Sequence, residues 1–146
     1  MKVKTIPNWP NRESFVVAEH RSLLTAMVFR GRRAVPILWV NHVGFYRHLH
    51  GEGVIQMGQD GYPDLVGTLY GGWSFYCETK RPKNSKTTQE QLAFGEIAKA
   101  VGAFHCISSS AVATAALVLK FLEEKYALQS QKVTVLTSQT SSGASF

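Results

Sequence analysis

The chain has 146 residues, a formal net charge of +6 and a sequence pI of about 9.5. Its hydrophobic content of 45% and charged content of 18% fit a single soluble domain and exclude a globally disordered chain. No run approaches the roughly 18 apolar residues that span a bilayer, and the first residues lack the apolar core of a signal peptide. We therefore expect a cytoplasmic protein, and its basic charge favours a polyanionic partner.

The two cysteines indicate a reducing compartment. Cys77 and Cys106 both lie inside apolar runs, which is typical of buried free thiols. No Cys-x-x-Cys pair and no Cys/His ligand spacing is present, so the sequence argues against a zinc site.

The first part of the chain predicts an irregular lead-in and then a helix. Residues 1–12 carry two prolines and no periodicity. A helix is expected from about Arg12 to Arg30, with Asn11 as its cap and Gly31 ending it. The arginines at its end either complement the helix dipole or contact phosphate, and the sequence favours neither interpretation.

Short extended segments follow this helix. Residues 36–40 predict a strand, and residues 54–57 a second one. The Gly- and His-rich residues 41–53 between them are expected to form a loop with short extended pieces.

The most informative segment is a predicted antiparallel hairpin. Two β-prone runs, residues 64–70 and 73–80, are joined by Gly71-Gly72. A Gly-Gly pair supplies the positive φ angles that tight hairpin turns require.

The last third predicts a polar loop, a helix over 89–101, a strand over 103–107 and a helix over 111–127. In the Ser/Thr-rich tail from Gln129, the run KVTVLT predicts a short edge strand. The order of elements indicates an α/β fold in which a mixed central sheet is flanked by helices. We expect one domain over residues 13–128, preceded by the lead-in and followed by a tail over 129–146.

Two carboxylates and one ammonium are expected to meet on the hairpin. Asp64 opens its first strand, and Glu78 and Lys80 lie near the end of its second. Side chains alternate across a strand, so Glu78 and Lys80 share one face while Cys77 and Thr79 point to the other.

These residue types suit phosphodiester hydrolysis. Carboxylate oxygens are hard ligands for Mg²⁺ or Mn²⁺, which lowers the pKa of bound water and offsets charge on phosphate. A nearby lysine can orient the water or stabilise the transition state. Asp64 and Glu78 are the predicted metal ligands, and Lys80 completes the catalytic set.

The same residues resemble the signature of the virus-type replication-repair nuclease family (VRR-NUC), which belongs to the PD-(D/E)xK nucleases. GYPD, ETK, TTQEQ and Gly102 follow in the order and spacing of that family, and WVNHVGF resembles its W-R-N-N-x-G stretch. The resemblance covers roughly residues 13–115 and implies a restriction-endonuclease-like core. Val40 and His42 depart from the pattern.

The resemblance also implies supporting residues. A Glu on the first helix is common in the family, and Glu19 is the best match here, as a third metal ligand beside Asp64 and Glu78. Thr79 stands where the family prefers an aliphatic residue, and because it is expected to point away from the active face, it should matter little.

Further residues have both structural and functional interpretations. Thr88-x-x-Gln91 is a capping box, which is compatible with a supporting catalytic role for Gln91. Basic side chains beside the motif are more often solvated surface, yet they are candidates for contacts with the DNA backbone; these are Arg47, Arg81, Lys83 and Lys86.

By the resemblance, we expect a structure-selective DNA endonuclease of the phage type. It would act in replication, recombination or repair as a homodimer on branched DNA such as four-way junctions, in the host cytoplasm if phage-encoded. One alternative is a non-catalytic nucleic-acid- or protein-binding module on a nuclease fold. The other is a sequence-specific restriction-type nuclease, for which the short chain leaves little room.

Overall fold

A computed structural model describes residues 12–41, 44–47, 54–57 and 60–141. It is a mixed α/β fold with a four-stranded sheet in the order β3-β6-β7-β8. The helices are α1 (Glu13–Ala26), α2 (Gln89–Ala100) and α3 (Ala111–Ser141), and the sheet strands are β3 (Ile37–Val40), β6 (Leu65–Thr68), β7 (Ser74–Thr79) and β8 (Phe104–Ser108).

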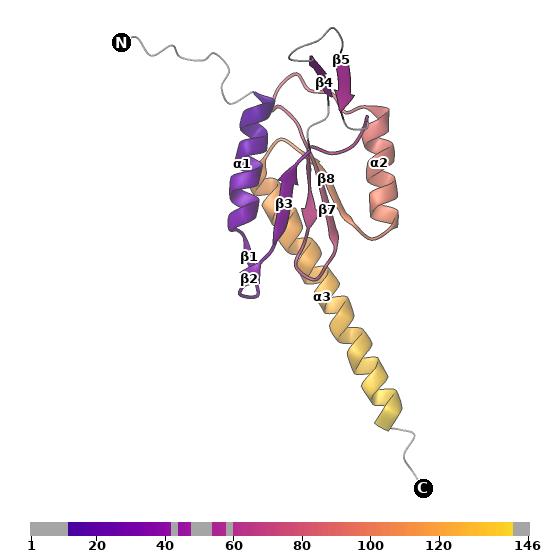
Figure 1. The fold of residues 1–146 in the computed structure, drawn as a ribbon. Coiled ribbons are helices and arrows are strands. Elements are labelled where there is room, and N and C mark those ends of the chain that lie inside the picture. The colour runs from indigo at the N-terminus through magenta and orange to yellow at the C-terminus, as the bar shows by residue number, and fades with distance from the viewer. Residues whose placement is uncertain (1–11, 42–43, 48–53, 58–59, 142–146) are drawn as a thin grey trace, which may run out of the picture.

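The sheet is mixed and has helices on both faces, as predicted. β3 pairs antiparallel with β6, β6 antiparallel with β7, and β7 parallel with β8. α1 and α3 pack against each other on one face, and α2 covers the other (Figure 1). Each of β7 and β8 is followed by a helix, and because these strands are parallel, α2 and α3 begin at the same edge of the sheet.

The main core lies between the sheet and the α1–α3 layer. Phe75, Leu65, Leu24 and Leu122 are completely buried there. Cys77 and Cys106 are buried free thiols, as expected, and stand directly side by side in the β7–β8 register. Apolar contact between the two layers therefore fixes the face of β7 that carries Phe75 and Cys77.

A buried histidine, which the sequence did not single out, joins the two helices of this layer. His20 on α1 is fully buried. Its Nδ1 donates to Val16 O at 2.8 Å, and its Nε2 lies 3.0 Å from Thr114 Oγ1 on α3. Burial lowers the pKa of His20, so we assign it a structural role as a neutral side chain.

The predicted β6–β7 hairpin is present and slightly shorter than expected. Gly71 and Gly72 have φ angles of +98° and +93°, which glycine adopts without steric cost. Two further strands, β4 (Gly44–Arg47) and β5 (Val54–Met57), form a separate antiparallel pair. They confirm the extended pieces predicted in this region.

The first helix ends earlier than the sequence indicated, and this corrects the prediction. It stops at Ala26 and is followed by a small hairpin of β1 (Val28–Phe29) and β2 (Arg32–Arg33). Arg30 and Gly31 both have positive φ angles, 50° and 74°, as in a tight two-residue hairpin turn. The arginines therefore do not cap a helix dipole; the guanidinium carbon of Arg30 lies 4.6 Å from the centroid of the Tyr126 ring. Asn11, the expected cap, lies outside the described residues.

The C-terminal prediction was also partly wrong. Ser110 Oγ accepts from Ala113 N at 3.2 Å, which confirms a serine cap. However, α3 continues to Ser141 through the run predicted as an edge strand. Between Ala111 and Ser141 the sequence has no Gly or Pro, so nothing interrupts the helix once it has formed.

In the part of the chain that is described, no helix is long and apolar enough to cross a membrane.

Candidate active site

Glu78 and Lys80 lie at the end of the central strand β7, on the face covered by α2. β7 has a partner on each side, so its side chains are shielded along both edges. Glu78 is only 6% exposed, and Lys80 Nζ lies 2.9 Å from Glu78 Oε1. A buried carboxylate is costly unless it is paired and hydrogen-bonded, and Lys80 provides that pairing.

Gln91 joins this ion pair to α2. Thr88 and Gln91 form the predicted capping box, in which Thr88 N donates to Gln91 Oε1 at 3.0 Å and Gln91 N to Thr88 Oγ1 at 3.3 Å. Gln91 Oε1 also accepts from Lys80 Nζ at 2.8 Å, and Gln91 Nε2 donates to Glu78 Oε1. The helix cap and the support of the ion pair are therefore provided by one side chain.

Asp64 directly precedes β6, at the same end of the sheet as this cluster. Leu65, the first residue of β6, pairs with Cys77, which brings Asp64 beside the last residues of β7. The negative charge of Asp64 acts on Glu78, so the two predicted acids lie at the same end of the hairpin.

Thr79 holds Asp64 in place, which corrects the expectation that it matters little. Asp64 Oδ2 accepts from both Thr79 N and Thr79 Oγ1 at 2.8 Å. Thr79 is almost completely buried, so both bonds are shielded from water. Because both bonds end on Oδ2, the other carboxylate oxygen, Oδ1, has no hydrogen bond from a described residue.

The segment before Asp64 is fixed by Asn41 and Gly61. Asn41 N donates to Asp64 O at 2.6 Å, and Asn41 Nδ2 donates to Pro63 O at 3.2 Å. Gly61 has φ +80°, and a Cβ there would lie 2.7 Å from Glu90 Cβ and 2.8 Å from the Glu90 carbonyl carbon. Gly61 thus allows the Asp64 segment to lie directly against the start of α2.

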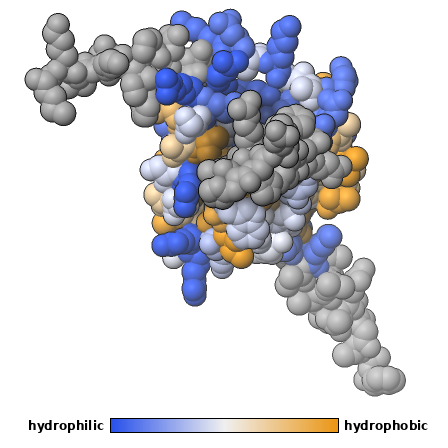
Figure 2. All heavy atoms as spheres, turned by 45° about the horizontal axis from the view of Figure 1, so that its top comes forward, coloured by the Kyte–Doolittle hydropathy of each residue, from blue (hydrophilic) through white to orange (hydrophobic). Residues whose placement is uncertain are grey.

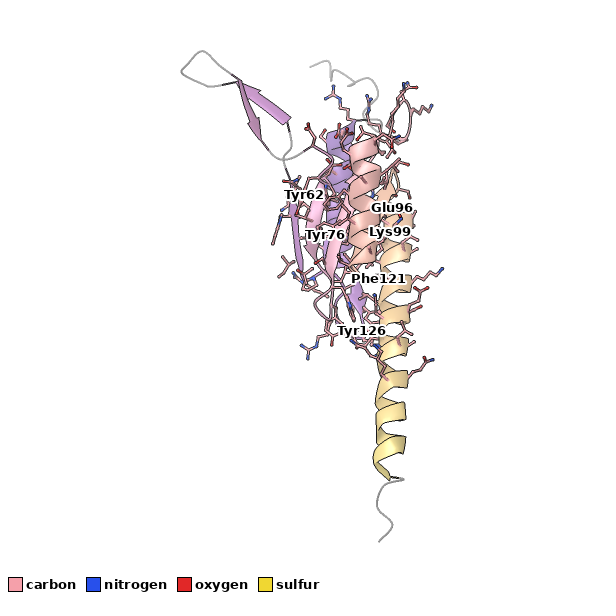
Figure 3. The ribbon with its side chains drawn as sticks, turned by 90° about the vertical axis from the view of Figure 1, so that its right-hand side faces the viewer. Tyr62, Tyr76, Glu96, Lys99, Phe121 and Tyr126 are labelled. Carbon is pink, nitrogen blue, oxygen red and sulfur yellow. The ribbon has the colours of Figure 1, made fainter. Side chains whose placement is uncertain are left out.

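Aromatic packing supports the same face. Tyr62 and Tyr76 both contact Phe94 of α2, with ring centroids 5.1 Å apart in each pair. Figure 3 shows Tyr62 and Tyr76 beside α2, with Tyr62 nearer the start of the helix. These edge-on contacts tie the Asp64 segment, β7 and α2 into one packed unit.

Glu13, the first residue of α1, is a further acid whose charge acts on the site. Burial raises the pKa of Glu78, and the negative charges of Asp64 and Glu13 raise it further, while the hydrogen bond from Lys80 opposes them. Glu13 also lines the same groove as Asp64. Glu19 is exposed and, unlike Glu13, is not among the residues that line this groove; its charge acts on the neighbouring His20, as does that of Asp64.

The candidate DNA-binding residues lie mostly in the loop between β7 and α2. Arg81, Lys83 and Lys86 are all exposed there, and Arg81 Nη2 donates to Asn84 O at 3.1 Å. Hydrophilic side chains gather in the upper part of Figure 2, which brings forward the end of the molecule where this loop lies in Figure 1. Arg47 belongs to β4, and its side chain is outside the described part of the structure.

The donor set is compatible with a hard divalent cation. Among the described residues there is no group of three or more His, Cys, Asp or Glu side chains arranged to hold a metal. Mg²⁺, however, is commonly held by one or two carboxylates and several waters. Asp64 and Glu78 supply such carboxylates. Burial, and after it the charge of Asp64, raises the pKa of Glu78, and a cation beside both acids would favour the ionised form.

Comparisons of the chain with protein-family models, with curated proteins and with solved structures found no match. The function proposed below is accordingly based on side-chain geometry and on the chemistry that it permits.

Proposed function

We propose that this chain is a Mg²⁺-dependent endodeoxyribonuclease with a PD-(D/E)xK core, which hydrolyses phosphodiester bonds in branched DNA. The observation that carries the proposal is the buried Glu78–Lys80 ion pair at the end of β7, with the charge of a second acid, Asp64, acting on Glu78. Same-face charges at the end of a central strand are costly. A catalytic role explains why they are grouped there.

Asp64 and Glu78 would hold the cation, and the charge of Glu13, which lines the same groove as Asp64, would add to the negative potential around it. When bound, Mg²⁺ or Mn²⁺ activates a water molecule and neutralises charge on the phosphate. The hydrogen bonds from Thr79 fix Asp64 Oδ2 in position, and Oδ1 would be the ligand atom.

Lys80 supplies the positive charge next to the reacting phosphate. Its side chain is 17% exposed, so the ammonium is partly accessible while Glu78 and Gln91 fix its position. An ammonium held in this way can donate to a phosphate oxygen whose charge increases in the transition state. Gln91 is a positioning residue, because it acts through Lys80 and Glu78.

The surroundings favour an anionic polymer. α2 and α3 both begin at this edge of the sheet, so the positive ends of their dipoles point toward it. The exposed Arg81, Lys83 and Lys86 add positive charge beside Lys80 and would contact the DNA backbone. We further propose a homodimer, since two-fold pairing suits a symmetric junction.

Cleavage assays test this proposal. The purified chain is incubated with linear, nicked, flap and four-way-junction DNA in Mg²⁺ or in EDTA. We expect Mg²⁺-dependent cleavage of the branched substrates, a loss of about 10²-fold or more in Asp64→Asn, and retained DNA binding by that variant.

Glu96→Gln is the matched control. Glu96 lies on α2 with its side chain 80% exposed, on the outward surface seen in Figure 3. It should cut at the wild-type rate. The absence of Mg²⁺-dependent cleavage on every substrate, or wild-type cleavage by Asp64→Asn, would overturn the proposal.

A further inference from the structure

β3 is an edge strand, and its outer side has no strand partner in the part of the chain that the structure describes. None of its residues is charged, and its register with β6 is continuous, without a bulge. Sheet edges are commonly protected by charged side chains or bulges, because an unprotected edge pairs with further strands. β3 has neither form of protection.

The free edge of β3 is accessible along its backbone. A groove of about 970 Å³ borders β3 on the side of α1, and the consecutive residues 38–41 all line it. Side chains alternate between the two faces of a strand, so what these residues share is the backbone edge. An extended segment can therefore lie alongside β3.

The hydrogen-bonding groups at this edge belong to Leu38 and Val40. Asn41 N donates to Asp64 O at 2.6 Å, so the amide of Asn41 points toward the β6 side. Backbone groups of successive residues point alternately to the two sides of a strand. The amides and carbonyls of Leu38 and Val40 therefore point away from β6, where a further strand would bind them.

A second copy of β3 fits these groups in one register. If Leu38 of each copy pairs with Val40 of the other in an antiparallel seam, all of the outward amides and carbonyls are used. The register that pairs Leu38 with its own copy would instead set Val40 opposite Pro36, which has no amide to donate. An antiparallel pair of identical strands has two-fold symmetry, so the assembly closes at two copies.

This register places the two Trp39 residues opposite each other at the two-fold axis. Trp39 pairs with Val66 and Val66 with Tyr76, and the Tyr76 ring contacts Phe94 of α2, so the indole lies on the α2 side of the sheet. Trp39 is 57% exposed. Opposed residues between hydrogen-bonded pairs are the closest across a seam, so the two indoles would pack on each other and lose this exposure.

The charges of α1 are complementary in the same arrangement. A two-fold axis perpendicular to the sheet places the α1 helices of both copies on one side of it, running in opposite directions. Glu13 and Arg21 both line the groove beside β3 and lie about two helical turns apart. The Glu13 end of one helix therefore faces the Arg21 end of the other across the seam, and opposite charges attract.

We propose that two copies of this chain join edge to edge through β3, with Trp39 at the two-fold axis and one sheet continuous across both copies. The proposal deepens the homodimer proposed above and rests on the nuclease function only for the use of that dimer on a symmetric junction. β6 lies between β3 and the catalytic strand β7, so the seam leaves Glu78 and Lys80 uncovered.

The molecular mass in solution tests the seam without DNA or metal. Sedimentation equilibrium of the full chain in EDTA should give twice the chain mass of 16.2 kDa. Trp39→Glu sets like charges opposite each other at the axis and removes the indole pair, so we expect the Kd of the dimer to rise about tenfold or more. Ile97→Glu is the matched control, because Ile97 is 67% exposed on α2, away from β3, and its dimer Kd should stay unchanged.

Cross-linking tests the register. Opposed residues between hydrogen-bonded pairs have the Cα separation that a disulfide needs. With oxidised glutathione as the acceptor of two electrons, Trp39→Cys should form a disulfide between copies, seen as a dimer on a non-reducing gel. Ile37→Cys is the matched control: Ile37 is exposed on the same strand but would lie opposite Asn41 of the other copy, so it should stay monomeric on the gel. The native thiols are buried.

The seam and the nuclease fail in different ways. A monomer at every concentration, an unchanged dimer Kd in Trp39→Glu, or no preference of cross-linking for Trp39→Cys over Ile37→Cys would overturn the seam, even if the chain cleaves DNA. A Trp39-dependent dimer without Mg²⁺-dependent cleavage would support the seam and overturn the nuclease. Thermal unfolding of each variant verifies that the fold is intact.

Discussion

At Glu78, the hydrogen bond and positive charge of Lys80 oppose the effects of burial and of neighbouring acids on the carboxylate pKa. Its carboxylate is nearly inaccessible, and its pKa is raised above the ordinary value of 4.5 by burial and by the charges of Asp64 and Glu13. As pH rises above 4.5, the unfolded chain releases this proton before the folded chain does. The folded protein therefore loses stability from Glu78 as pH rises through the window between the two pKa values.

Glu78→Gln removes this pH-dependent loss. In EDTA, the stability of the variant relative to wild type should increase between pH 4 and pH 7, because only wild type pays for ionising the buried acid. Urea unfolding at the two pH values measures the difference. If wild type instead gains stability over Glu78→Gln as pH rises, Lys80 outweighs the burial and our description of the charge balance is incorrect.

Removing the Thr79 hydroxyl should weaken both stability and cleavage. Its hydroxyl and amide both donate to Asp64, and hydrogen bonds to charged groups contribute about 1.5–3 kcal/mol. Thr79→Val keeps the shape and loses the hydroxyl, so we expect about 1–2 kcal/mol of destabilisation in urea unfolding and slower cleavage. Thr79→Ser keeps the donor and should recover most of both. Wild-type stability and cleavage in Thr79→Val would contradict this role.

At the scale of elements, the site is the junction of β6, β7 and the start of α2. The β6–β7 register brings Asp64, which directly precedes β6, beside the end of β7, and the capping residue Gln91 hydrogen-bonds to the ion pair. The close approach at Gly61 brings these elements together. A small displacement of α2 would therefore shift the position of Lys80, even though Asp64, Glu78 and Lys80 themselves are not substituted.

Gly61→Ala should produce that displacement. The new Cβ would combine a positive φ with a clash against the backbone of α2, for an expected loss of about 1–3 kcal/mol together with slower cleavage. Gly72→Ala is the matched control, since Gly72 has φ +93° but open space around it. It should show the backbone strain in urea unfolding with cleavage unchanged. Equal effects of the two substitutions on cleavage would contradict the close-approach explanation.

Local rules of the sequence predicted the parts of this junction that depend on neighbouring residues. The Gly71-Gly72 turn, the Thr88–Gln91 capping box and the alternation that pairs Glu78 with Lys80 all involve short separations along the chain. Each is fixed by backbone geometry before tertiary contacts form, and each is present in the structure.

The features that the sequence did not predict depend on distant segments. Thr79 matters because β6 places Asp64 within reach of it, and Glu13 approaches Glu78 only through the packing of α1 onto the sheet. His20 becomes a core residue because α3 supplies Thr114 as its partner. Helical periodicity alone could not separate Glu13 from Glu19, since both occupy exposed positions on α1.

For the whole molecule, the two ends of the sheet differ in character. The end where β7 and β8 finish carries the acids, Lys80, the basic loop and the starts of α2 and α3. The opposite end carries the hairpin of β1 and β2 and an aromatic cluster, in which the Tyr70 and Tyr126 rings stack with centroids 5.8 Å apart. The first end is where we propose phosphate chemistry, because the proposed cation ligands and the positive ends of the two helices lie together there.

Whether Lys80 takes part in Mg²⁺-dependent cleavage can be measured directly. The single-turnover rate of cleavage of a flap or four-way-junction DNA in Mg²⁺ is compared for wild type, Lys80→Ala and Lys99→Ala. Lys99 is an exposed lysine near the far end of α2 and serves as the control for charge. We predict Mg²⁺-dependent cleavage by wild type and Lys99→Ala, and a rate reduced about 10²-fold or more in Lys80→Ala with unchanged DNA binding. Wild-type cleavage by Lys80→Ala, or no cleavage by any of the three proteins, would contradict it.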